Sequence, residues 1–247
     1  MAAPFALFVF PLDESGLIPI LAISFFVHVA YEWFMAASYT KGAFTLVYPV
    51  ARGTAPAITS LIAILVFHET LASVQWIGIL LLSGAIVALA GVNLREQQLD
   101  DAIKAALLPS VFLAIGAGIC VSLYTIVDAY GIRLAVNPFT FLVWFFFLGG
   151  LGFPLVALAR WRNMEVKPPI RPLIVRGFTG ACVALFSFGT LMLATRIGKV
   201  SEAAALRETS ILFAAVIGVL FLGEKLSVGK GVIIGLIALG ALLIELG

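Results

Sequence analysis

Arginine side chains occur in the middle of two long apolar segments, at Arg52 and Arg207. Each lies about nine residues into its segment, roughly 13 Å at a helical rise of about 1.5 Å per residue, which is close to the middle of a bilayer. A guanidinium at that depth can hold a carboxylate or a phosphate through two parallel hydrogen bonds. It can also satisfy a neighbouring acid and lock two parts of a protein together. We predict that Arg52 and Arg207 bind substrate, with the structural role as the alternative.

Other polar side chains lie in similar apolar segments. His28 and Glu32 are four residues apart, so they share a helix face, and Tyr31 lies beside them. A carboxylate in a helix bundle can be neutralised by a proton or by a cationic group. We therefore predict that Glu32 and His28 couple protons and that Glu32 and Tyr31 contact substrate, with a buried His–Glu hydrogen bond as the alternative. Glu208 points about 100° away from Arg207 on a helix, so it is expected to contact substrate or an arginine of another element.

Several further residues receive structural interpretations. Glu69 and Glu224 precede predicted helices, where a carboxylate stabilises exposed amides, so both are expected to be helix caps. Asp128 lies at the end of a predicted helix and is expected to be solvated, with a contact in a gate as the alternative. Tyr48 and Tyr124 could stack on a substrate, but such residues gather at membrane interfaces, and we interpret them as anchors.

Metal and cofactor chemistry is poorly supported by the sequence. The histidines, His28 and His68, lie on different predicted helices, and Cys120 and Cys182 lie inside apolar runs. Neither a His-Glu-x-x-His zinc motif nor a phosphate-binding Gly-x-x-x-x-Gly-Lys-Ser/Thr loop is present. We predict no metal, no cofactor and no enzymatic activity.

Composition requires that these residues be positioned by membrane helices. Hydrophobic residues make up 62% of the 247 residues and charged residues only 11%, whereas soluble domains carry about a quarter charged residues. The net charge of +2 gives no basic surface for nucleic acid. Apolar runs of about 20 residues predict an all-α integral membrane bundle of about eight transmembrane helices, near 17–40, 43–66, 72–92, 105–129, 138–159, 173–195, 198–222 and 227–246.

The sequence contains an internal repeat. Shifting the chain by 155 residues aligns Arg52 with Arg207 and Glu69 with Glu224, and the predicted helix boundaries coincide. Five predicted crossings separate the two copies, so the copies have opposite orientations in the membrane. Inverted repeats are typical of secondary transporters, in which similar halves exchange shapes to open a central site to each side in turn.

The ends of the two repeats resemble a known family. Residues 67–71 read Phe-His-Glu-Thr-Leu, and residues 222–226 read Leu-Gly-Glu-Lys-Leu, followed by the glycine-spaced helix of Gly235 and Gly240. These segments are similar to the Gly-Glu-x-Leu turn and last helix of EamA-type transporters of the drug/metabolite transporter superfamily, with His68 in place of the first glycine. The resemblance implies transport of metabolites, a bacterial inner membrane and two five-helix halves.

This chain departs from that ten-helix pattern. We interpret residues 1–98 as an N-terminal EamA-like half of three helices, lacking the first two, and residues 99–247 as a C-terminal half of five. Either the start is truncated or misassigned, or a homodimer completes the bundle. Lysine and arginine gather in the loop at 160–172, which predicts that this loop is cytoplasmic and that both termini are outside. The resemblance implies cytoplasmic termini instead.

The sequence therefore predicts a secondary active transporter that moves a small organic metabolite, an amino acid or similar, through the lipid bilayer by alternating access. A non-transporting or partner-dependent membrane subunit, or an N-terminally truncated transporter, is the alternative. Arginine suggests an anionic group in the substrate and Glu32 suggests a cationic one, which a zwitterion would combine.

Overall fold

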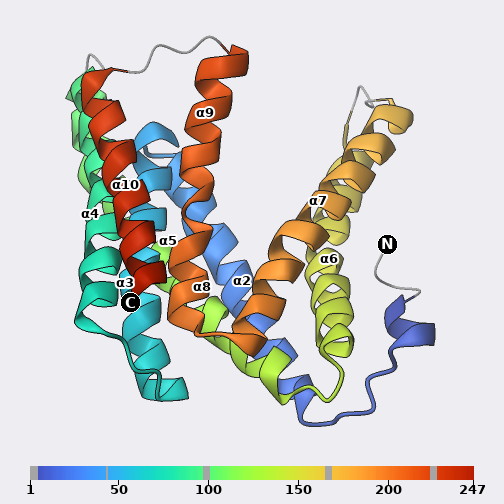
Figure 1. The fold of residues 1–247 in the computed structure, drawn as a ribbon. Coiled ribbons are helices and arrows are strands. Elements are labelled where there is room, and N and C mark those ends of the chain that lie inside the picture. Colours follow the sequence, from blue (N-terminus) through green and yellow to red (C-terminus); the bar gives the residue numbers. More distant parts are fainter. Residues whose placement is uncertain (1–4, 43, 97–100, 165–168, 223–226) are drawn as a thin grey trace. The chain divides into compact units, whose positions relative to one another are not determined.

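The computed structural model describes residues 5–42, 44–96, 101–164, 169–222 and 227–247. These residues form a succession of helices, shown in Figure 1, and no strand occurs in the described ranges. Their bounds are η1 Phe5–Val9, a short π-helix, and the α-helices α2 Leu17–Tyr39, α3 Phe44–Phe67, α4 Ser73–Glu96, α5 Asp101–Leu134, α6 Pro138–Arg162, α7 Ile170–Ile197, α8 Val200–Arg207, α9 Ser210–Leu222 and α10 Val228–Leu246.

Seven segments in the described part of the chain are long and apolar enough to cross a membrane, with α8 and α9 forming one of them. In α6 the apolar stretch Pro138–Leu151 is shorter. The predicted all-α, multi-pass membrane fold is confirmed, and the helix bounds differ from the predicted ones by a few residues. One difference is substantial, because the segment predicted as a single helix over 198–222 is interrupted between α8 and α9.

Contacts divide the chain into two compact units. The first unit comprises Met1–Phe26 and Val127–Ile197, and the second comprises Val27–Ile126 and Gly198–Gly247. Helices α2 and α5 contribute to both, because the unit boundaries fall inside them. The predicted halves, 1–98 and 99–247, follow the sequence repeat and are a different kind of division, which stays a prediction.

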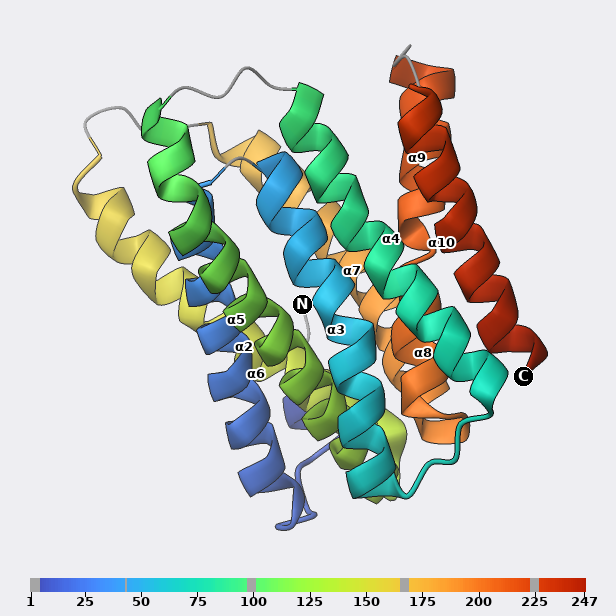
Figure 2. The same cartoon turned by 90° about the vertical axis from the view of Figure 1, so that its left-hand side faces the viewer.

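The second unit is built by close packing of helices at glycines. Helices α4 and α10 lie side by side in Figures 1 and 2 and share a core that includes Ile79, Leu82 and Ile237. At their crossing, a Cβ atom on Gly78 would lie 2.7 Å from the carbonyl oxygen of Gly240. Apolar helices gain no hydrophobic energy from leaving lipid for one another, so such close backbone contacts are a main source of their association.

Helix α3 is held by the same kind of contact on two sides. A Cβ on Gly53 would lie 2.9 Å from the carbonyl oxygen of Ser83 in α4, and one on Gly118 of α5 would lie 2.8 Å from the carbonyl oxygen of Ala51. The hydroxyl of Ser122, also in α5, donates a 3.0 Å hydrogen bond to the carbonyl of Ala55. These contacts flank Arg52 and fix the helix that carries it.

The turn after α3 contains a strained residue. His68 has a φ of 53°, in the left-handed region that glycine adopts at the least cost. This residue takes the place of the glycine in the Gly-Glu-x-Leu pattern. The backbone therefore keeps a glycine-like conformation although the residue has a side chain.

Glu69, which follows His68, is a helix cap, but of a helix distant in sequence. Its carboxylate accepts hydrogen bonds from the backbone amides of Val200 at 2.5 Å and Ser201 at 3.1 Å, and from the Ser201 hydroxyl. These groups open α8, whereas the helix that follows Glu69 in sequence is α4. The carboxylate thus ties the α3–α4 turn to the start of α8. The other predicted cap, Glu224, lies outside the described residues.

A second polar group, Gln75, strengthens that attachment. Its amide donates to the carboxylate of Glu202 at 2.7 Å and to the carbonyl of Ile244 at 3.3 Å, and it accepts from the ammonium of Lys199 at 3.2 Å. Lys199 also forms an ion pair with Glu202 at 2.9 Å. Gln75 of α4 is therefore bonded both to the first turn of α8 and to the end of α10.

In the first unit the ends of α2, α5, α6 and α7 pack around a core that includes Leu17, Ile132 and Phe141. Asp128 was expected to be solvated, but its carboxylate is buried and accepts a 2.5 Å hydrogen bond from the hydroxyl of Ser24. The prediction failed because α5 continues to Leu134, beyond the predicted end at 129. Asp128 is therefore more than one turn inside the helix.

Large apolar side chains cover the outside of the helices, including Phe26, Leu65, Phe186 and Phe221. Phe221 is 79% exposed. A soluble protein would bury such residues, whereas a protein dissolved in lipid exposes them to the hydrocarbon chains.

Candidate functional site

Arg52 lies in the middle of α3, within the second unit. Its Nε donates a 3.1 Å hydrogen bond to the hydroxyl of Tyr48, one turn earlier, and its guanidinium carbon lies 5.4 Å from the centre of the Tyr48 ring. Its Nη1 donates a 3.1 Å hydrogen bond to Oε1 of Glu208. Tyr48 is thus a positioning residue for Arg52, although the sequence indicated an interface anchor.

The partner residues lie where α8 ends and α9 begins. Nε of Arg207 donates to Oε1 of Glu208 at 3.3 Å, so one carboxylate oxygen receives both guanidiniums. Arg52 and Arg207, aligned by the sequence repeat, therefore meet at a single acid. We call Arg52, Arg207 and Glu208 the arginine cluster.

The helix interruption places these charges together. The amide of Ile211 donates to the carbonyl of Glu208 at 3.1 Å, three residues back, and that of Leu212 donates to Thr209 at 2.9 Å. These tighter bonds replace the four-residue bonds of a regular α-helix. In α3 the corresponding place is held by Pro56, which has no amide hydrogen to donate to the carbonyl of Arg52.

Charge in the arginine cluster does not balance. Among the described residues, Glu208 is the ion-pair partner of both arginines, and no second acid pairs with either. Two guanidiniums and one carboxylate carry a net charge of +1. The carboxyl side chain is 0% exposed, whereas the arginine side chains are 21% and 15% exposed, so the excess positive charge is the accessible part.

Tyrosines of α2 and α5 also lie near Arg52. The guanidinium lies within electrostatic range of the phenols of Tyr31 and Tyr39 on α2 and of Tyr124 on α5. The rings of Tyr31 and Tyr124 meet edge to face, with centroids 5.6 Å apart. Tyr31, a predicted substrate residue, is therefore brought next to the arginine cluster.

The other predicted residues of α2 are placed differently. His28 stacks on Tyr124, with ring centroids 4.2 Å apart and planes 26° apart, so it joins the aromatic group. Glu32 is exposed, and among the described residues it forms no ion pair or hydrogen bond with His28 or with the arginine cluster. The structure thus brings together Arg52, Arg207, Glu208, Tyr31 and His28, and it leaves Glu32 on the outside of α2.

Sequence reasoning missed Tyr48 and Tyr124 as neighbours of the cluster. Tyr48 carried a signal, because it precedes Arg52 by four residues and so shares its helix face. Tyr124 carried none, because its approach depends on how α5 packs against α2 and α3.

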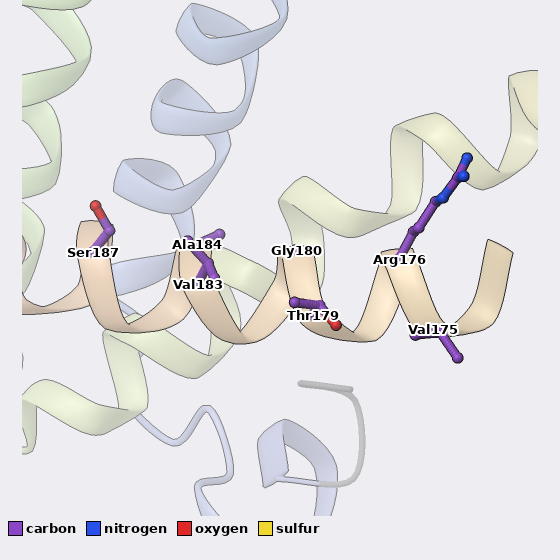
Figure 3. A pocket seen from close by; sticks show the side chains of 7 residues that line it. All are labelled: Val175, Arg176, Thr179, Gly180, Val183, Ala184 and Ser187. Atoms are coloured by element: carbon purple, nitrogen blue, oxygen red, sulfur yellow. The ribbon is translucent and has the colours of Figure 1, made fainter. Parts of the chain in front are cut away.

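A hollow of about 550 Å³ lies in the first unit, and Figure 3 shows its lining. Every lining residue belongs to one face of α7, among them Arg176, Thr179 and Ser187. Groups from several elements do not converge there, so this open hollow is a surface feature of one helix. In the described part of the chain, no group of three or more His, Cys, Asp or Glu residues is arranged to hold a metal ion.

Comparison with known families gives one match. The model described as "EamA-like transporter family" matches residues 108–246, which is more than half of the chain and contains Arg207 and Glu208 of the arginine cluster. A comparison with curated proteins finds no match.

Proposed function

We propose that this chain, which belongs to the EamA-like transporter family, is a secondary active transporter that binds a carboxylate-bearing organic metabolite at Arg52 and Arg207. The chain is a multi-pass membrane protein of the drug/metabolite transporter superfamily, which is a family of transporters and not of enzymes. We further propose that it works by alternating access and lies in a bacterial inner membrane.

One observation carries the proposal. Two arginines from different copies of the repeat share one buried carboxylate oxygen and leave a net charge of +1 inside an apolar bundle. An uncompensated charge at membrane depth is expensive, and such charges usually mark a substrate or ion pathway. An anionic group of a substrate would compensate this one.

The hydrogen-bonding capacity of the arginines fits a carboxylate. Each guanidinium has five N–H donors. In the described structure, Arg52 uses Nε and Nη1, and Arg207 uses Nε alone. The remaining donors can form the paired bonds with which arginine recognises carboxylates. The rings of Tyr31 and Tyr124 would contact the apolar part of the same small organic metabolite.

Alternating access requires helices that bend near the binding site. The interruption at Glu208 and Pro56 beyond Arg52 both weaken a helix directly after a cluster arginine. Discontinuous helices at the midplane occur in transporters with inverted repeats, where they carry the binding residues through the change of shape. Proton coupling by His28 and Glu32 remains part of the proposal, with His28 the nearer of the two to the aromatic group.

Transport in proteoliposomes tests this proposal. The purified chain and its Arg52→Gln and Arg207→Gln variants are assayed with a panel of labelled carboxylates, with and without an imposed proton gradient. The matched control is Arg171→Gln, which removes the same charge from an exposed position at the start of α7. We expect flux of at least one carboxylate, loss of that flux in the two cluster variants and unchanged flux in the control.

Other results would contradict the proposal. Equal flux in all four proteins, each shown to be folded by its melting temperature, would exclude the arginines as the binding site. Absence of flux from the unaltered chain for the whole panel would favour the partner-dependent subunit.

A further inference from the structure

We infer that Glu208 sets the net charge of the substrate, so that this transporter prefers organic monoanions and would prefer dianions without that carboxylate. The inference rests on the proposed function and adds the substrate's charge class to it. It depends on the charges, burial and free donors of the arginine cluster.

Glu208 is a built-in counter-ion of the two arginines. Its Oε1 lies 3.1 Å from Nη1 of Arg52 and 3.3 Å from Nε of Arg207, and its side chain is fully buried. Its Oε2 is buried and has no hydrogen-bond partner among the described residues. The carboxylate therefore acts on the two arginines alone, and it cancels one of their two charges.

The described side chains around the cluster supply no second carboxylate. From α2, α3 and α5, the phenols of Tyr31, Tyr39, Tyr48 and Tyr124 lie near Arg52, and His28 stacks on Tyr124. None of these side chains is a carboxylic acid that could add to Glu208. Beside the cluster, Leu206 and Ile211 pack against the apolar core shared by α4 and α10, whereas the polar contact of α8 with Gln75 lies at its first turn. Among the described side chains on these elements, no second carboxylate pairs with the arginines, so the cluster of three residues keeps its charge of +1.

Ligands of different charge would leave different net charges in the cluster. A monoanion would bring the cluster to neutrality, whereas a dianion would leave one negative charge and a zwitterion one positive charge. An ammonium group would also need an acid, and Glu208 is already shared by the arginines. Glu69 and Glu202 are bonded at the opposite end of α8, and Glu32 is exposed on α2. Since an unbalanced charge in an apolar bundle is costly, a monoanion fits best.

Ligand-induced thermal stabilisation of the detergent-solubilised chain tests the inference with three probes that share a three-carbon skeleton. L-Alanine is a zwitterion, L-lactate a monoanion and malonate a dianion at neutral pH. We expect L-lactate to bind best to the unaltered chain. Glu208→Gln, with a cluster charge of +2, should shift the preference towards malonate by about tenfold or more.

Two more variants separate charge from structure. Arg207→Gln makes the cluster neutral and should shift the preference from L-lactate towards L-alanine. The double variant, Arg207→Gln with Glu208→Gln, restores a charge of +1 and should restore the preference for L-lactate. Glu245→Gln, which neutralises an exposed acid in α10, is the control and should leave the order unchanged. If Glu208→Gln fails to fold, Arg207→Gln alone still tests the rule.

The outcomes distinguish this inference from the proposed function. If the probes bind through the arginines but their order is the same in all variants, Glu208 has only a structural role, and the inference is overturned while the proposed site stands. If no probe binds to the unaltered chain, carboxylate recognition itself is contradicted, and the inference falls with it.

Discussion

The crossing of α4 and α10 gives the sharpest prediction for stability. At this point a Cβ added to Gly78 would meet the carbonyl oxygen of Gly240 at 2.7 Å, and one added to Gly240 would meet that of Gly78 at 2.8 Å. Both obstacles are backbone atoms, which cannot turn aside as a side chain can. Replacing either glycine by alanine must therefore move the helices apart.

The distances set the size of the effect. Ordinary Cβ contacts begin at 3.4 Å, so Gly78→Ala requires a local separation of about 0.7 Å from the carbonyl oxygen at 2.7 Å. Overpacking of this kind costs about 1–3 kcal/mol. Alanine also favours a helix over glycine by about 0.5–1 kcal/mol, which offsets part of the loss. We expect a net destabilisation of about 1–2 kcal/mol for each single variant.

Each helix supplies its own control. Gly84 in α4 and Gly235 in α10 have no atom within 4 Å of an added Cβ, so their alanine variants keep the helix-propensity gain without the clash. Unfolding is followed by tryptophan fluorescence and far-UV circular dichroism as SDS is titrated into mixed micelles. The double variant at Gly78 and Gly240 should lose less than the two single losses together, because one separation relieves both clashes. Equal stability of Gly240→Ala and Gly235→Ala would refute the packing argument.

Two further predictions concern the turn after α3. His68→Gly should be more stable than His68→Ala by about 1 kcal/mol, because only glycine adopts the φ of 53° without strain, and equal melting temperatures would contradict this. Glu69→Gln should lose about 1–2 kcal/mol of stability, because the amides at the start of α8 lose their charged acceptor. Glu245→Gln, at an exposed acid, should lose none by the same SDS titration, and similar losses in both would show that the cap contributes nothing.

Helix positions were predictable because crossing hydrocarbon requires long apolar runs, and polar or glycine- and proline-containing segments end them. The break between α8 and α9 was not predicted. It contains neither glycine nor proline, but Arg207, Glu208, Thr209 and Ser210 form a polar run within an apolar segment. That polar run is the feature of the sequence from which the break could be predicted.

The candidate site was predictable only in part. The repeat alignment singled out Arg52 and Arg207, and their helical spacing implied that Glu208 would meet an arginine of another element. Which face of α2 is turned towards the arginines could not be predicted, because α2 is apolar around most of its circumference. For that reason Tyr31 and Glu32 were predicted together, although the structure places Tyr31 near Arg52 and exposes Glu32.

The two helix interruptions have a consequence for how duplicated halves diverge. Pro56 and Ile211 occupy the same position in the repeat, and a comparison of letters scores them as a mismatch. In the first copy, Pro56 has no amide hydrogen to donate to the carbonyl of Arg52. In the second copy, the amide of Ile211 donates to the carbonyl of Glu208 in a tighter turn, and not to that of Arg207. After a gene duplication, both copies can thus lack the same helical hydrogen bond although different residues cause its absence. Searches for internal repeats should therefore compare backbone geometry as well as residues.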